Sequence, residues 1–124
     1  GGSGYLFRAA TVQDFSAVTG ACLLVRTSVW DEVKGLDEKF AVAFNDVDFC
    51  LRVRDKGYRI VWTPYAQLTH YESKSRGLDT TPENAARYAR EKANFYTKYH
   101  EYIDHYDPYY NPHFNNLFEN FGLK

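Results

Sequence analysis

The sequence predicts a mixed α/β fold in which a small sheet of two to four strands packs against helices, with a long helix towards the carboxy terminus. Apolar residues recur at helical spacing over 45–56, and residues 58–62 alternate as a strand does. From Pro82 onward, alanines and aromatic residues recur on one face of a long helical segment. The 124 residues match the length of about one domain. A sheet this small gives a modest core, which indicates a part of a larger structure.

The first predicted strand covers residues 17–25, which are apolar and partly β-branched. Gly20 interrupts this run, and we expect either a bulge or a close approach of the backbone to a ligand there. Residues 1–4, Gly-Gly-Ser-Gly, have the composition of a linker or tag remnant and take no part in the predicted fold. Residues 5–112 are predicted to form one structural unit, followed by a tail over 113–124.

Two helices are predicted in the middle of the chain. The first runs over 27–34, starts at a cap supplied by Thr27 or Ser28, and ends naturally at Gly35. The second runs over 45–56 and has basic residues in its last turn, just before a glycine.

The second half of the chain adds short strands and the long helix. A strand over 58–62 is broken by Pro64, and a second short strand is predicted over 66–70. Pro82 suits the first turn of the long helix. The residues expected on one face of this helix are Ala85, Tyr88, Ala89, Phe95, Tyr99 and Tyr102.

Composition restricts the function. The formal net charge is -1 and no basic stretch occurs, so a nucleic-acid partner is not expected. No apolar run is long enough to span a bilayer and no secretory signal is recognisable, so the chain is expected in the cytoplasm or at the membrane periphery. Aromatic residues make up 18% of the chain, which favours wet grooves or interfaces. Cys22 and Cys50 are expected to be buried hydrophobic residues rather than a disulfide or a metal pair.

The segment Asn45-Asp46-Val47-Asp48 lies where a loop is expected to enter the second helix. Carboxylates two residues apart near a helix start point in different directions, so at most one faces a given site. Asn45 is a favourable N-cap, and the helix dipole stabilises acids in a first turn without any chemical role. The local sequence leaves capping and catalysis open and favours capping.

His70 ends the second short strand and precedes the polar loop 71–77. Its neutral imidazole could bind a divalent metal, and Ser73, Ser75 and Arg76 could hold phosphate oxygens. One histidine does not make a metal site. The loop alone therefore favours a hydrogen-bonded surface histidine.

Several short stretches follow one another in a defined order. They are 17–26 (AVTGACLLVR), 35–40 (GLDEKF), 44–52 (FNDVDFCLR), 57–60 (GYRI), 63–66 (TPYA), 70–77 (HYESKSRG) and 107–112 (DPYYNP). Together they resemble the second half of bacterial family 2 glycosyltransferases. The resemblance extends from about Phe15 to Pro112, and its specificity lies in the ordered series rather than in any one piece.

This resemblance implies the GT-A fold, a nucleotide-sugar donor, a divalent metal (Mn²⁺ or Mg²⁺) and inversion at the anomeric carbon. Asp46 falls where such enzymes place the carboxylate that removes the proton from the acceptor hydroxyl. His70 matches a position that can contact the metal in related enzymes. The other implied site residues are Thr19, Gly20 and Asp48 on the acceptor side and Ser73, Ser75 and Arg76 at the donor diphosphate.

Asp46-Val47-Asp48 also satisfies the letter of the DxD metal motif of GT-A enzymes. That motif belongs at a strand end in the donor-binding half, whereas this one opens a helix, so it is interpreted as the acceptor-side motif. The resemblance implies that the donor-binding half is absent from these residues. The isolated chain is therefore expected to be inactive, and it need not hold the metal by itself.

A function of a different class stays open. The excess of tyrosine and phenylalanine suits a non-catalytic module that binds a glycan or a partner protein through an aromatic surface. Separation from the rest of a domain would also expose an apolar sheet edge or face, through which the fragment is expected to self-associate.

Overall fold

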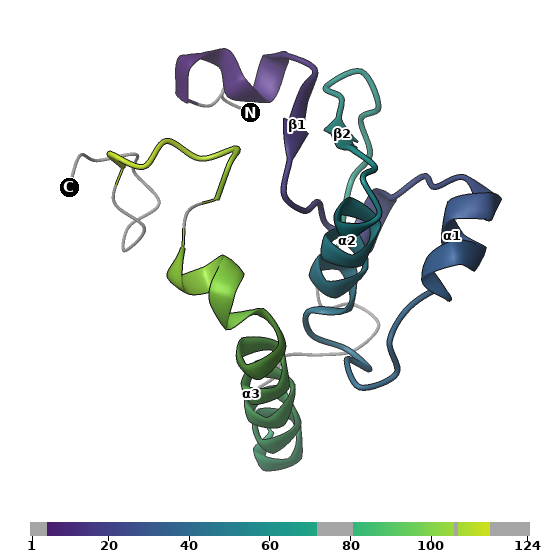
Figure 1. Cartoon of the computed structure of the whole chain (residues 1–124), viewed down its shortest axis with the longest axis vertical. Helices are drawn as coiled ribbons and strands as arrows, with labels where there is room; N and C mark the ends of the chain where they lie inside the picture. The colour runs from purple at the N-terminus through teal and green to yellow at the C-terminus, as the bar shows by residue number, and fades with distance from the viewer. Residues whose placement is uncertain (1–4, 72–80, 106, 115–124) are drawn as a thin grey trace.

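The structure is a computed structural model that describes residues 5–71, 81–105 and 107–114, and it confirms the mixed α/β fold. Helix α2 stands between α1 and α3, with the small sheet beyond one end of α2 (Figure 1). The sheet has two strands, β1 and β2, which pair antiparallel with Phe15 opposite Ile60. The elements in chain order are the 3-10 helix η1 (Tyr5–Ala10), β1 (Gln13–Phe15), the 3-10 helix η2 (Gly20–Cys22), α1 (Thr27–Val33), α2 (Asn45–Asp55), β2 (Ile60–Trp62) and α3 (Pro82–Asp104).

The main core lies where α1, α2 and β2 meet. Partly buried side chains from the segment between β1 and α1 close it on one side. The core is small, as the sequence indicated: α1 contributes two buried residues, α2 three and β2 one. Its buried members are Val29, Val33, Phe49, Cys50, Val53 and Ile60.

The predicted strand over 17–25 is wrong. The chain forms η2 there, and the Thr19 hydroxyl accepts a hydrogen bond from the Ala21 amide at 3.3 Å. Val18 and Leu23 pack against the core from this segment, but the two-stranded sheet does not include it. The strand that forms instead is β1, in the stretch just before residue 17, where no strand was predicted. The burial expected of this apolar run holds only in part: Val18 and Leu23 are partly buried against the core, whereas Cys22 and Leu24 are exposed.

Helix α1 confirms the helix predicted over 27–34, but not its cap. The N-cap residue is Arg26, and it makes no side-chain capping hydrogen bond. Capping by Thr27 or Ser28 is therefore wrong, because both residues already lie inside the first helical turn. The helix ends at Lys34 in the left-handed region, followed by Gly35.

The second half confirms one of the two predicted strands. Strand β2 lies inside the predicted range 58–62. The strand predicted over 66–70 is wrong, since these residues form a bend and irregular structure. Leu68 is 73% exposed, so its side chain gains no burial that would stabilise an extended pairing.

Position 35 requires glycine for two reasons, its backbone conformation and the close neighbour Trp30. Its φ is +65°, a region that disfavours side chains, and a Cβ there would lie 2.9 Å from Cζ2 of Trp30. The Trp30 ring packs on Phe49 with centroids 5.3 Å apart, so it cannot easily move away. The Trp30 ring therefore restricts position 35, at the end of α1, to glycine.

We expect Gly35→Ala to lower the free energy of unfolding by about 2–3 kcal/mol, the sum of backbone strain and a clash with the indole. Gly57→Ala is the matched control, because Gly57 has φ +87° but no atom within 4 Å of its added Cβ. Urea unfolding should give about 1 kcal/mol for this control. Equal losses in the two variants would mean that Trp30 does not constrain position 35.

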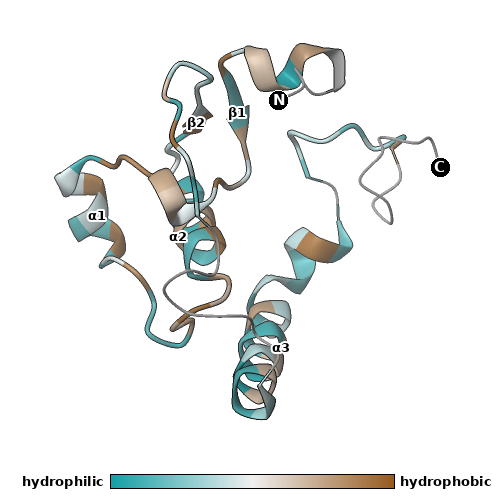
Figure 2. Cartoon of the chain, turned by 180° about the vertical axis from the view of Figure 1, so that it is seen from behind, coloured by the Kyte–Doolittle hydropathy of each residue, from teal (hydrophilic) through white to brown (hydrophobic). Residues whose placement is uncertain are grey.

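Helix α3 starts as predicted, with Pro82 in the first turn and the Thr81 hydroxyl accepting from the Asn84 amide. The residues predicted to share one face of this helix are not buried together, because Tyr99 is buried whereas Ala85 and Ala89 are exposed. Most of the α3 ribbon is hydrophilic (Figure 2). The helix therefore contacts the rest of the molecule through a few aromatic and charged side chains rather than through a continuous apolar stripe.

The two cysteines differ. Cys50 is buried in the core as expected, and burial raises the pKa of its thiol. Cys22 is exposed, so its expected burial is wrong: the chain forms η2 here rather than the buried strand on which that expectation rested. Both thiols are free, as expected.

The segment 107–114, which follows α3, returns to the start of the chain. Arg8 donates a hydrogen bond to the Tyr109 carbonyl at 3.3 Å, and the Ser16 hydroxyl donates one to Asp107 at 2.5 Å. Figure 1 shows this segment beside η1 and β1. Within the described ranges, no helix is both long enough and apolar enough to cross a membrane.

Candidate functional site

A pocket of about 410 Å³ lies where η2, α1, the start of α2 and the segment after β2 come together. Its apolar lining residues include Leu23, Trp30 and Leu36. Its polar residues are Thr19, Asn45, Asp46 and His70, and Gly20 and Ala21 complete the lining. Apolar residues combined with a few polar groups are typical of the lining of small-molecule sites.

Asp46 is held in this pocket by the backbone of η2. Its Oδ2 accepts a hydrogen bond from the Gly20 amide at 2.8 Å, and its Oδ1 accepts one from the Val47 amide at 2.9 Å. A Cβ on Gly20 would lie only 3.2 Å from the Asp46 Cβ. The backbone at Gly20 is thus closely approached by the Asp46 side chain, whereas the approach to a ligand that we expected there stays a prediction.

The start of α2 differs from the predicted cap. The N-cap residue is Phe44, which lies in the left-handed region with φ 65° and makes no side-chain capping bond. Capping by Asn45 is wrong, because Asn45 is already the first helical residue. Left-handed backbone at a bulky residue costs about 1–3 kcal/mol unless its surroundings enforce it. Asp46 thus follows a turn that something else must stabilise.

Asp48 points away from the pocket, as the spacing of the two carboxylates predicted. It is 0% exposed, and its carboxylate accepts hydrogen bonds from Arg52 at 2.8 Å, Lys98 at 2.6 Å and the Tyr99 hydroxyl at 2.7 Å. The structure does not bring Asp48 to the pocket and leaves it no surface for contact with an acceptor. Its contacts instead join α2 to α3.

Two neighbours of Asp48 extend this connection. Arg52 also donates to the carbonyls of Val33 at 2.5 Å and Gly35 at 2.7 Å, which attaches the end of α1 to α2. Burial and the hydrogen bond to Asp48 raise the pKa of Tyr99 far above its usual range. Tyr99 therefore stays a neutral hydrogen-bond donor at any physiological pH.

The structure places part of the predicted metal and phosphate residues. His70 lies in the same pocket as Asp46, Thr19 and Gly20. Ser73, Ser75 and Arg76 fall outside the described residues. Within the described ranges, no three or more His, Cys, Asp or Glu side chains gather into a cluster that could hold a metal ion.

The sequence analysis did not predict the apolar residues Trp30 and Leu36 as part of a site. Trp30 is 39% exposed and Leu36 is 46% exposed, and they bracket the left-handed end of α1. A hydrophobic pair on either side of a terminating glycine is a frequent helix-end pattern, so the spacing around Gly35 was the available signal. Glu91 accepts a hydrogen bond from the Ala43 amide in the loop before α2. The sequence analysis did not predict this role, because a glutamate within a helix usually faces solvent.

The chain belongs to a known enzyme family. Residues 2–106 match the family described as Glycosyl transferase family group 2, which covers most of the chain. The chain is therefore part of a family 2 glycosyltransferase domain. Its two-stranded sheet and long carboxy-terminal helix agree with a partial GT-A fold.

Three curated relatives are similar over part of this region. An uncharacterized protein y4gI of Sinorhizobium fredii is 51% identical over 72% of this chain and 10% of its own length. The O-antigen biosynthesis protein RfbC of Myxococcus xanthus is 39% identical over 57% of the chain and 6% of its own length. The N-acetylglucosaminyl-diphospho-decaprenol L-rhamnosyltransferase of Mycobacterium tuberculosis is 35% identical over 57% of the chain and 23% of its own length. The matched region is thus a small part of each relative, and no solved structure matches the chain significantly.

Proposed function

We propose that this chain forms the acceptor side of an inverting glycosyltransferase active site, with Asp46 as the general base. The observation that carries the proposal is the Asp46 carboxylate, anchored by the Gly20 amide at 2.8 Å in a pocket that both apolar and polar residues line. The membership of the chain in glycosyl transferase family group 2 supports the reaction class. The donor is a sugar attached to a nucleoside diphosphate.

The reaction needs a base because a sugar hydroxyl is a poor nucleophile. Asp46 would take the proton of the acceptor hydroxyl as its oxygen forms a bond to the anomeric carbon of the donor. The bond from that carbon to the nucleoside diphosphate breaks on the opposite face, and the electron pair leaves with the diphosphate. The Gly20 amide already holds one carboxylate oxygen in place, so the base needs little reorganisation during the reaction.

The remaining pocket residues suit an acceptor sugar. The Thr19 hydroxyl and the Asn45 amide can hydrogen-bond to sugar hydroxyls, and Trp30 with Leu36 provides apolar surface for the less polar face of a ring. We propose an acceptor glycan of a bacterial surface polysaccharide, in line with the names of RfbC and of the rhamnosyltransferase.

The donor side of the proposal concerns fewer residues of this chain. His70 can supply one ligand to a divalent cation beside the pocket, and Ser73, Ser75 and Arg76 are proposed to contact the diphosphate. Since the described residues gather no cluster of three ligands, most of the cation's ligands would come from the diphosphate and from other parts of the full-length protein. A cation bound there would offset the negative charge of the leaving group.

Exposed apolar residues indicate where the rest of the domain would sit. We propose that the donor-binding half covers these side chains in the full-length protein, and that the chain self-associates through them when it is alone. The exposed fractions are 97% for Leu24, 73% for Leu68, 67% for Phe7, 53% for Val12 and 50% for Val61.

We expect the isolated chain to transfer no sugar, because the donor would lack most of its binding surface. Mixing the chain with radiolabelled nucleotide sugars and bacterial glycan acceptors should give no labelled product above a protein-free blank. The positive control is a full-length protein that contains this chain. Product formation by the chain alone would mean that it binds the donor without the other half of the domain.

The exposed tyrosines favour a second candidate function, a non-catalytic module that holds a glycan. Tyr65 is 83% exposed and Tyr71 is 67% exposed. Asp46→Asn in a full-length protein separates the two functions, with sugar transfer and donor binding measured independently. Loss of transfer supports catalysis by Asp46, and glycan binding without any dependence on Asp46 supports the module.

A further inference from the structure

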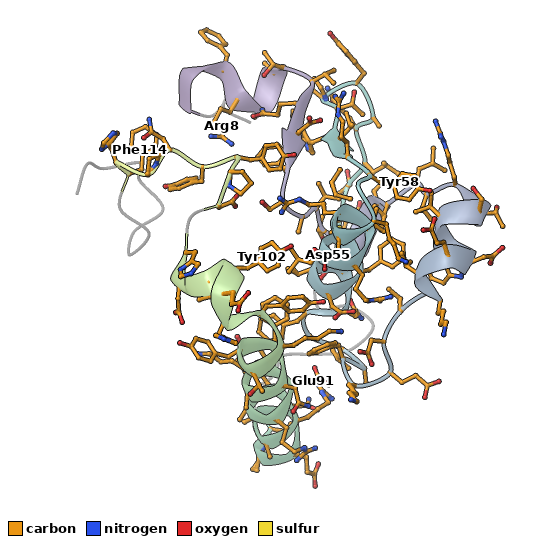
Figure 3. All side chains as sticks on the ribbon, viewed as in Figure 1. Arg8, Asp55, Tyr58, Glu91, Tyr102 and Phe114 are labelled. Carbon is orange, nitrogen blue, oxygen red and sulfur yellow. The ribbon has the colours of Figure 1, made fainter. Side chains whose placement is uncertain are left out.

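Helix α3 holds the loop that leads into α2. Glu91 is only 4% exposed, and its Oε2 accepts a hydrogen bond from the Ala43 amide at 2.6 Å. The Nε atom of Arg87, one turn earlier, lies 3.9 Å from the other oxygen of the same carboxylate. Figure 3 shows Glu91 on the side of α3 that faces this loop. A buried carboxylate bound to a loop amide fixes that loop more firmly than a neutral acceptor does.

Aromatic contacts from the same helix hold the next residue. The ring of Phe44 stacks on Phe95 with centroids 4.9 Å apart and 21° between the planes. It also lies 5.7 Å from the ring of Tyr88. Phe44 is the left-handed residue before α2, so these rings hold the side chain of the strained position itself.

We propose that Glu91 and Phe95 of α3 are positioning residues that set the place of Asp46. The inference rests on the proposed function, in which Asp46 is the general base. Neither Glu91 nor Phe95 lines the pocket. They act on Asp46 only through the conformation of the residues just before it.

The path from α3 to Asp46 is short. Glu91 fixes the amide of Ala43, and Phe95 fixes the ring of Phe44. The Phe44 carbonyl then accepts the first hydrogen bond of α2, from the Asp48 amide at 2.8 Å. The left-handed turn at Phe44 therefore decides the direction in which α2 starts, and with it the distance from Asp46 to the Gly20 amide.

Hydrogen exchange of single backbone amides in this chain, followed by NMR, tests the inference. Glu91→Ala removes the acceptor for the Ala43 amide, so exchange at Ala43 and at the distant Gly20 should accelerate about tenfold. Glu91→Gln keeps an oxygen that can accept from Ala43 and should restore both amides to within about threefold of the unchanged chain. Glu101→Ala, an exposed acid on the same helix, is the matched control and should change neither.

The Val53 amide in the middle of α2 reports whether the fold survives, and its exchange should stay constant in all variants. If Glu91→Ala accelerates Val53 as well, Phe95→Leu decides the question, because it removes the ring stack but keeps apolar volume. Phe95→Leu should accelerate exchange at Gly20 while Val53 is unchanged. An unchanged Gly20 amide in a variant that accelerates only Ala43, or in a folded Phe95→Leu chain, overturns the inference.

This experiment is independent of sugar transfer. If Asp46→Asn leaves transfer intact while Gly20 responds to Glu91 as expected, the proposed function fails and the structural coupling holds. If Asp46→Asn abolishes transfer while exchange of the Gly20 amide is unchanged in the α3 variants, Asp46 keeps its proposed role and the positioning by α3 is wrong. In a full-length transferase, Glu91→Ala should lower kcat with little change in KM, and Glu91→Gln should recover most of it.

Discussion

Replacement of Asp46 with asparagine in a full-length protein that contains this chain should lower sugar transfer by about 100- to 10000-fold, the usual contribution of a general base. Asparagine has nearly the same shape as aspartate, and its oxygen can still accept from the Gly20 amide, although its NH2 group replaces the oxygen that accepts from the Val47 amide. The pocket should therefore keep most of its structure while the acceptor hydroxyl loses its base. A radiochemical transfer assay measures the loss.

Two measurements make this result specific to catalysis. Affinity for the nucleotide sugar, measured by calorimetry, should be nearly unchanged in Asp46→Asn, because Asp46 lies on the acceptor side of the proposed site. Asp31→Asn, which changes an exposed acid on α1, should leave transfer unaffected. Turnover by Asp46→Asn within a few-fold of the unchanged enzyme would remove Asp46 from the catalytic role.

Replacement of Asp48 with alanine should produce the largest loss of stability. The variant would leave Arg52, Lys98 and the Tyr99 hydroxyl facing one another without their shared acceptor. Removing one partner of a buried ion pair costs about 3–5 kcal/mol. Lys98 and Arg52 retain some contact with solvent, with side chains 37% and 21% exposed, so we expect the lower end, about 3 kcal/mol. That is a large share of the roughly 5–15 kcal/mol that keeps a domain folded.

Thermal unfolding of the chain should show this loss as a Tm lower by about 10 °C or more. Asp37→Ala is a matched control, because Asp37 accepts from the same Lys98 amine at 3.2 Å but lies closer to solvent, and it should cost at most about 1 kcal/mol. Tyr99→Phe removes only the hydroxyl and should cost about 1 kcal/mol. If Asp48→Ala is no less stable than Asp37→Ala, the buried carboxylate does not join α2 to α3.

The second contact between these helices is more exposed. The Tyr102 hydroxyl donates to the Asp55 carboxylate at the end of α2, and Figure 3 shows the two side chains close together. This hydrogen bond raises the pKa of Tyr102. Because it lies towards solvent, it adds less to the attachment of α3 than the contacts of Asp48 do.

The sequence predicted the helices better than the strands. The helical period of residues 45–56 gave α2, and Pro82 marked the start of α3, because both signals come from neighbouring residues. The strand predicted over 17–25 is wrong and β1 was missed, because a strand needs a partner that sequence spacing does not specify. The candidate site was predicted mainly from the series of short stretches that resemble family 2 enzymes. The sequence around Asp46 alone favoured a helix cap over a catalytic residue.

The sequence by itself determined that this chain belongs with the glycosyltransferases, that a carboxylate pair opens α2, and that its two members point in different directions. Only the tertiary structure decided which carboxylate faces the pocket. The Gly20 amide and the left-handed turn at Phe44 turn Asp46 towards the pocket, while α3 surrounds Asp48 with Lys98 and Tyr99. The physical reason is that Gly20, Lys98 and Tyr99 lie 26 to 51 residues along the chain from the carboxylates they contact, and their placement depends on packing rather than on any local pattern.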